Sequence, residues 1–183
     1  MKNVWTNTLA WAGAVAAALV LAFAAPSDST VMGKLPSLTA KRLDQRTLSL
    51  PAGLPSDRTL ALIAFERGHH GDIESWIQGL QLRQNPDINW LRMPVLQDPG
   101  HAQGRSAIEN RLLARYTTEG ERSRMLPVFT DRAAFIRAAG LSSPHTAYAV
   151  VLNRNGDVLA RVEGQFDQDK ANALRETLFS REF

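Results

Sequence analysis

Two adjacent histidines, His69 and His70, have the residue type and spacing best suited to chemistry in this sequence. They lie in the charged, glycine-flanked segment ERGHHG. Imidazole nitrogens bind zinc, copper and nickel, and neighbouring histidines in a loop can each present a ring to one ion. Two surface histidines in a polar loop, or a polar contact with a protein partner, would explain the same pair. The residues alone leave these three interpretations open.

Covalent catalysis finds little support in the sequence. The chain has 183 residues and no cysteine. A thiolate is the nucleophile of disulfide exchange, so thiol-dependent oxidoreductase or peroxidase activity is excluded. Ser75, His70 and Asp72 are close in sequence, but helical geometry would point Ser75 away from the loop, and no G-x-S-x-G elbow is present. We therefore expect no catalytic residues.

The charge pattern argues against a nucleic-acid partner. The formal net charge is +3 and the sequence pI is about 9.7, but the basic residues are scattered. Nucleic-acid binding proteins concentrate their positive charge in a patch or stripe. We expect a mixed-charge surface that binds no nucleic acid.

The N-terminus is typical of an export signal. Lys2 precedes an uncharged apolar run from Leu9 to Ala25, which contains the small-x-small triplet AFA. These features predict that residues 1–25 are a signal peptide, or an uncleaved anchor that holds the protein at the membrane. Either form places the remainder outside the cytoplasm, in the periplasm or an equivalent space. Residues 26–34 are expected to be a linker, and 35–183 a domain.

The first half of this domain predicts a hairpin and then a strand–helix–strand unit. Residues 35–51 hold two apolar segments around a polar turn, as in a β-hairpin. The uninterrupted apolar run 59–65 is typical of a buried strand. Asp72 is expected to cap the following helix, whose apolar face includes Trp76, and 88–96 is expected to be the next strand.

The middle of the chain carries weaker signals. Ser106 and Glu109 form an S-x-x-E capping box, which predicts that a helix begins there. His101 is expected to be a loop residue just before it. The polar residues 117–124 are expected to be mobile. On the strand before this region, Arg92 could stack on the indole of Trp90.

The last third predicts a short helix, a hairpin and a final helix. Asp131 is expected to cap the short helix, and Gly140 to end it. Residues 147–163 read as two strands around an NRNG turn, which is a strong hairpin signal. Asp167 or Asp169 would cap the final helix.

The order of these elements resembles the thioredoxin-like fold in its redoxin or peroxiredoxin form, over residues 35–179. The resemblance rests on the segments TLALIAF, LPVFTDRAAFIRAAGL and AYAVVLNRNGDVLARVEG, in that order. It implies an α/β domain of three layers with an N-terminal hairpin. Redox-active members carry cysteine at the turn that here is 66–71, and a cis-proline at the position that here is Ala147. The resemblance therefore implies that the whole redox site has been lost.

One branch of the superfamily, the mitochondrial ATP synthase assembly factors of thioredoxin-like fold, shares both losses and ends in a similar hairpin. This resemblance implies an assembly or binding role. Together with the export signal, it leads us to expect a non-catalytic, exported module that binds or assists the assembly of an unidentified protein partner. Its expected binding surface comprises Glu66, Arg67 and Asp72.

Sco-type copper chaperones suggest the alternative, since they bind metal at the same region of this fold with two cysteines and a histidine. The fold implies that His145 lies near His69 and His70. These three histidines, without thiolates, form the alternative hypothesis of a Cu or Zn site in a metal-binding or chaperone protein.

Overall fold

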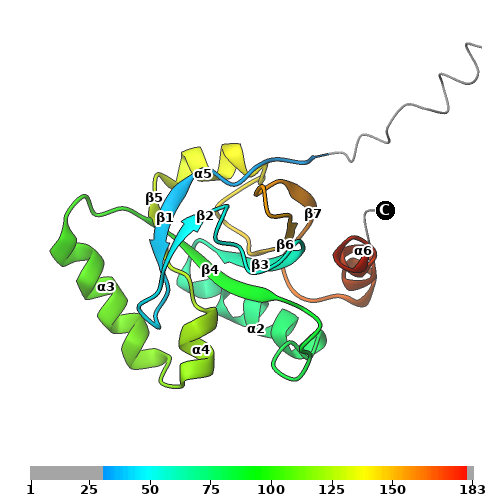
Figure 1. Ribbon diagram of the computed structural model, residues 1–183, viewed down its shortest axis with the longest axis horizontal. Coiled ribbons are helices and arrows are strands. Elements are labelled where there is room, and N and C mark those ends of the chain that lie inside the picture. Colours follow the sequence, from blue (N-terminus) through cyan, green and yellow to red (C-terminus); the bar gives the residue numbers. More distant parts are fainter. Residues whose placement is uncertain (1–30, 181–183) are drawn as a thin grey trace, which may run out of the picture.

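A computed structural model describes residues 31–180, which form a mixed five-stranded sheet with helices on both faces and a separate hairpin (Figure 1). The sheet order is β5-β4-β3-β6-β7, in which β3 is parallel to β4 and antiparallel to β6. The sheet strands are β3 (Thr59–Ala64), β4 (Trp90–Gln97), β5 (Val128–Thr130), β6 (Tyr148–Leu152) and β7 (Val158–Glu163), and the hairpin strands are β1 (Leu38–Lys41) and β2 (Thr47–Leu50).

The helices connect these strands and include one 3-10 turn directly before the first helix. They are η1 (Arg67–His69), α2 (His70–Gly79), α3 (Ala102–Arg115), α4 (Glu119–Arg124), α5 (Arg132–Ala138) and α6 (Gln168–Phe179). None of the helices within residues 31–180 is long and apolar enough to cross a membrane. The predicted signal or anchor segment, 1–25, lies outside the described residues.

The sheet is covered by apolar side chains on both faces, which confirms the predicted three layers. Along β6, Tyr148 and Val150 pack with Phe135 of α5 and with the hairpin, whereas Ala149 packs with α2 and α6. Successive side chains of a strand point to opposite faces, so a strand covered on both sides must be apolar at every position. All five residues of β6 are buried for this reason.

Trp76 joins α2 to the chain beyond β7. Its indole is fully buried, and Nε1 donates a hydrogen bond to the carbonyl oxygen of Gly164 at 2.8 Å. The ring of Phe166 packs edge-on against it, with ring centroids 5.3 Å apart. The prediction that Trp76 belongs to the core is confirmed.

The described end of the predicted linker, residues 31–34, is hydrogen-bonded to the domain. The amide of Met32 donates to the carbonyl of Val158, and the amide of Val158 donates to the carbonyl of Gly33. Lys34 then hydrogen-bonds through its amide to the carbonyl of Ala138. The described part of this segment is therefore held against the start of β7 and the end of α5.

Two predicted helix starts are wrong. Helix α2 begins at His70, so Asp72 lies in its first turn and is not its cap. Helix α3 begins at Ala102, before the expected capping box, and the His101 imidazole caps it by accepting a hydrogen bond from the Gly104 amide at 3.0 Å. His101 is thus a helix cap and not merely a loop residue.

The segment 117–124 was expected to be mobile, but most of it forms helix α4. Thr118 caps this helix by accepting from the amide of Glu121. The guanidinium of Arg122 donates to the carbonyls of Tyr116 and Leu113 at the end of α3. These contacts explain why a polar segment without an apolar face is helical.

The last third agrees with its sequence pattern. Asp131 caps α5, and Gly140, with φ of +66°, follows the end of that helix. Asp167, and not Asp169, caps α6 by accepting from two backbone amides. Phe179, the last residue of α6, is half exposed.

Candidate functional site

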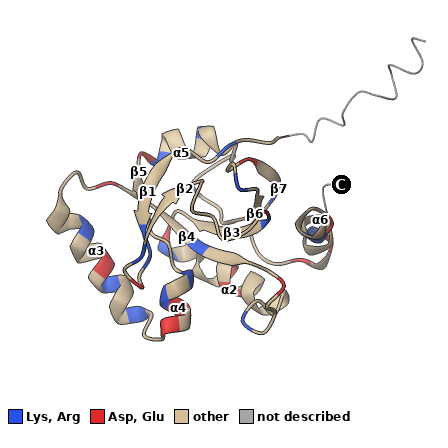
Figure 2. Cartoon of the chain, viewed as in Figure 1, with Lys and Arg blue, Asp and Glu red and all other residues tan. Residues whose placement is uncertain are grey.

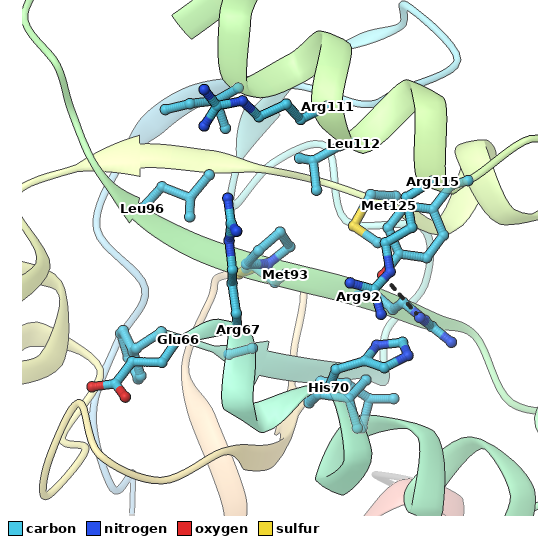
Figure 3. Close-up of a pocket in the computed structure, with 17 residues that line it drawn as sticks. Glu66, Arg67, His70, Arg92, Met93, Leu96, Arg111, Leu112, Arg115 and Met125 are labelled. Atoms are coloured by element: carbon cyan, nitrogen blue, oxygen red, sulfur yellow. Dashed lines mark hydrogen bonds between the residues drawn. The ribbon is translucent and has the colours of Figure 1, made fainter. Parts of the chain in front are cut away.

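The parallel strands β3 and β4 end at the same edge of the sheet, and a cavity of about 620 Å³ opens beside that edge (Figure 3). Ligands of α/β proteins commonly bind outside the carboxyl ends of parallel strands, and cavities of about 300–1,000 Å³ suit small ligands or side chains. Residues of η1, α2, β4 and α3 surround the cavity. Its apolar walls include Leu62, Pro94, Leu96, Ile108, Leu112 and Met125.

The rim of this cavity is basic. Arg67 lines it from η1, and Arg111 and Arg115 line it from α3. Figure 3 shows Arg67 extending from η1 toward α3, with Arg115 directed toward His70. All three residues are exposed, and in the described part of the chain none of their guanidiniums pairs with a carboxylate.

The charge along α3 explains this rim. The helix contains three arginines and one glutamate, and Figure 2 shows its basic positions spread along its length. The glutamate, Glu109, is bound by Lys41 of β1 at 3.0 Å. Arg105 is bound by Asp98 at 2.6 Å. The positive charges of Arg111 and Arg115 are therefore not balanced by a neighbouring carboxylate of α3 or by Asp98.

The floor of the cavity contains a buried ion pair. Arg92 on β4 is only 7% exposed, and its guanidinium donates to the carboxylate of Glu74 on α2 and to the hydroxyl of Tyr116. Arg83 binds the other oxygen of Glu74 at 2.6 Å. Burial alone raises the pKa of Glu74, but the hydrogen bonds and charges of Arg83 and Arg92 outweigh it and hold that pKa below its usual value.

The expected stacking of Arg92 on Trp90 is not observed. The guanidinium carbon of Arg92 lies 5.4 Å from the centre of the Tyr116 ring. Trp90 instead stacks with Arg124, at 4.9 Å, and its Nε1 donates to the carbonyl of Leu82. Both aromatic rings accept a cation, but Arg124 arrives from α4, whose presence the sequence did not indicate.

The two adjacent histidines have different environments. His69 is buried, and its Nδ1 accepts a hydrogen bond from the backbone amide of Phe65 at 3.3 Å. His70 lines the cavity. Burial and the nearby charges of Arg115 and Arg92 lower the pKa of His70 below its usual value, which favours the neutral imidazole.

The third histidine belongs to the surface beside the cavity. A ring nitrogen of His145 lies 3.1 Å from a carboxylate oxygen of Glu66, which joins the loop before β6 to the loop after β3. The thioredoxin-like resemblance implied that His145 lies close to the turn at 66–71, and this contact agrees with that expectation.

The three histidines are not assembled into a metal site. Within residues 31–180, no group of three or more histidine, cysteine, aspartate or glutamate side chains could hold an ion together. The Nδ1 atom of His69 is already engaged with the backbone. The geometry thus gives no support to the Cu or Zn hypothesis.

The residues expected to form a protein-binding surface differ in their relation to the cavity. Glu66 and Arg67 line the cavity, but Asp72 does not. Ser75 has no catalytic arrangement with His70, because its hydroxyl donates to the Asp72 carbonyl and accepts from the amide of Phe166. The expectation that Ser75 points away from the loop is confirmed.

Sequence reasoning missed the contribution of α3. Ile108, Arg111, Leu112 and Arg115 follow the spacing i, i+3, i+4 and i+7, which places them on one helical face. Once a helix is assumed over these residues, that spacing identifies a face that is both apolar and basic. No sequence pattern indicated that Arg92 lines the cavity, because it is a single charged residue within an otherwise apolar stretch of β4.

The strand order and this edge define a thioredoxin-like fold without a thiol redox centre. In the described residues, the peptide bond before Ala147 is trans, and the cis peptide bond is Leu50–Pro51. The chain contains no cysteine. This chain therefore has neither the cysteines nor the cis-proline that redox-active members of this fold carry.

Solved structures show the same fold. A protein from Aquifex aeolicus proposed to act in electron transport is 15% identical, with a TM-score of 0.55 over 80% of this chain and 97% of that one. The N-terminal domain of PilB from Neisseria gonorrhoeae is 14% identical, with a TM-score of 0.51 over 78% and 89%. The pneumococcal exposed lipoprotein thioredoxin from Streptococcus pneumoniae is 12% identical, with a TM-score of 0.50 over 78% and 98%.

At these identities the likeness shows the fold alone. No protein-family model matches the sequence, and no curated protein matches it. The similarity to ATP synthase assembly factors remains a prediction.

Proposed function

We propose that this chain is an exported, redox-inactive thioredoxin-like module that binds a protein partner and assists its assembly. The observation that carries the proposal is the cavity at the carboxyl ends of β3 and β4, which has apolar walls and a basic rim. It adjoins the turn 66–71, where the resemblance places the thiols of redox-active relatives. Export is supported by the charged start and apolar run of the first 25 residues.

The lining favours binding over covalent catalysis. It contains no serine, threonine, cysteine or lysine among the described residues. The lining therefore offers no serine, threonine, cysteine or lysine nucleophile. The guanidinium of Arg92 is neutralised by Glu74, and the hydroxyl of Tyr116 is engaged by Arg92. The remaining free charges are those of the rim, which suit recognition of an anionic group.

Site-specific crosslinking tests this function. A photoreactive amino acid at position 107, an exposed alanine one turn before Arg111 on α3 that does not line the cavity, should capture one reproducible protein when the full chain is expressed in its own cells. Mass spectrometry can identify that protein. Chemical crosslinking of the unmodified chain should capture the same protein, and the variant R111Q/R115Q should lose it. The matched variant R137Q/R175Q removes the same charge from α5 and α6 and should retain it. Failure to capture a reproducible protein, or equal capture by both variants, would contradict the proposal.

A further inference from the structure

The cavity presents positive charge that the rest of the described chain does not neutralise. Four arginines and one glutamate line it. Arg92 is paired with Glu74, and the lining glutamate, Glu66, contacts His145. The charges of Arg67, Arg111 and Arg115 remain available to an incoming group, and Figure 3 shows them around the same space.

The arginines favour carboxylate ligands, and their exposure favours a ligand with more than one. A guanidinium presents a planar fork of donors that matches a carboxylate. A single ion pair at an exposed position contributes little to affinity because water competes with it. A ligand that forms ion pairs with two of these arginines and also buries an apolar group would gain affinity from several individually weak interactions.

The spacing on α3 matches an extended peptide. Arg111 and Arg115 are one turn apart, which corresponds to a rise of about 6 Å along the helix axis. Side chains at i and i+2 of an extended chain lie on one side and are about 7 Å apart. Two acidic residues with one residue between them can therefore face both arginines.

The intervening residue of such a peptide would point away from α3. The opposite side of the cavity is formed by β4, where Pro94 and Leu96 present apolar surface. An apolar side chain at that position would be removed from water there. The cavity thus suits a peptide in which acidic and apolar residues alternate, because successive side chains of an extended chain point to opposite sides.

We infer that the cavity docks an extended acidic–apolar–acidic segment of a partner protein, with carboxylates on Arg111 and Arg115 and the apolar side chain against β4. Arg67, on the other wall, supplies further positive potential. This inference rests on the proposed function, because it specifies which kind of partner segment the module takes.

Calorimetric titration with defined peptides tests the inference. The probe is acetyl-Ser-Glu-Leu-Glu-Ser-amide, compared with versions that carry Gln-Leu-Gln or Glu-Ser-Glu at its centre. The Glu-Leu-Glu peptide should bind at least about tenfold more tightly than the Gln-Leu-Gln peptide, and severalfold more tightly than the Glu-Ser-Glu peptide. Its affinity should fall as salt is added, because exposed charges are screened.

Matched variants locate the effect. R111Q/R115Q should weaken binding of the Glu-Leu-Glu peptide at least about tenfold, whereas R137Q/R175Q should not change it. Thermal unfolding of each variant verifies that it is folded. Equal binding of the Glu-Leu-Glu and Gln-Leu-Gln peptides, or equal binding by both variants, would overturn the inference. Tighter binding of decanoate than of the peptide would also overturn it, in favour of a small amphipathic anion.

The outcomes separate the two proposals. If the peptides do not discriminate but position 107 still captures a partner in an arginine-dependent way, the proposed function stands and the segment type is wrong. If no partner is captured although the peptide binds as expected, the cavity recognises acidic segments but the assembly role is wrong.

Discussion

The carboxylate of Glu74 on α2 accepts a hydrogen bond from the guanidinium of Arg92 on β4, and this contact joins helix and strand beneath the cavity. Arg92 is almost completely buried, while the Glu74 side chain is 23% exposed. A buried guanidinium needs a counter-charge, because it cannot lose its proton. Arg83 shares this carboxylate but does not line the cavity, so the unpaired guanidiniums of the lining are those of the rim.

Glu74→Gln should destabilise the fold. The substitution keeps the shape of the side chain but removes the charge that compensates Arg92. We expect the free energy of unfolding to fall by about 2–3 kcal/mol, since Glu74 is partly exposed and water can replace some of the interaction. Urea unfolding followed by circular dichroism measures this loss. Glu176→Gln, on the exposed side of α6, is the control and should change stability by less than about 0.5 kcal/mol. Equal effects of the two substitutions would show that the pair adds no stability.

His70 should make stability depend on pH below about 6.5. The pKa of His70 in the fold is lowered from 6.5, first by burial and then by Arg115 and Arg92. Between the lowered pKa and 6.5 the unfolded chain binds more protons, so the free energy of unfolding decreases as pH falls. His70→Gln should flatten this dependence between about pH 7.5 and 5.5.

Proton NMR of the His70 ring gives a direct check on that origin. Its midpoint should lie below 6.5 in the folded protein. A midpoint at or above this value would contradict the assignment, even if stability varied with pH. The carboxylates whose pKa is lowered, such as Glu74 and Asp157, act at lower pH, because their usual values are 4.5 and 3.8.

Two glycines of α2 should respond oppositely to alanine. A Cβ at Gly79 would lie 2.5 Å from ring atoms of Phe166, which packs on Trp76, so Gly79→Ala should cost about 1–3 kcal/mol. A Cβ at Gly71 would meet no atom within 4 Å, and Gly71→Ala should stabilise by up to about 1 kcal/mol. Thermal unfolding of both variants tests the pair, and a loss of stability in Gly71→Ala would contradict the described start of the helix.

His101→Ala should weaken the start of α3. The imidazole accepts a hydrogen bond from the Gly104 amide, and loss of a helix cap costs about 0.5–2 kcal/mol. His101→Asn should recover most of that stability, because its amide oxygen can accept the same bond. Amide exchange of residues 102–105 would report the fraying directly. Unchanged exchange in His101→Ala would mean that packing alone holds this end of the helix.

The elements that could be predicted are those whose local pattern and tertiary environment agree. The β6–β7 hairpin carries an Asn-Gly turn between strands, and β6 is apolar at every position because helices cover both of its faces. Asp131 is a strong cap followed by an apolar helical face, and it caps α5 in the structure. At these places local preference and global packing require the same conformation.

The elements that were missed depend on contacts distant in sequence. Glu109 completes an S-x-x-E pattern, but its carboxylate pairs with Lys41 of β1 and does not return to Ser106. Helix α4 is held by Arg122, which binds carbonyls at the end of α3. The basic rim is similar, because Arg67 lies far from Arg111 and Arg115 in sequence and lines the same cavity only in the folded chain.

The hydrogen bonds of Met32 and Gly33 with Val158 fix where the N-terminal side of the described chain meets the domain. Val158 lies opposite Leu152, and Leu152 lies opposite Thr59, at the amino end of β3. The cavity lies toward the other end of β3, where Leu62, Ala64 and the residues that follow line it. If the domain were tethered through its N-terminal side, the attachment point and the basic cavity would lie at opposite ends of β3. The cavity would then face away from the tether and be accessible to a partner.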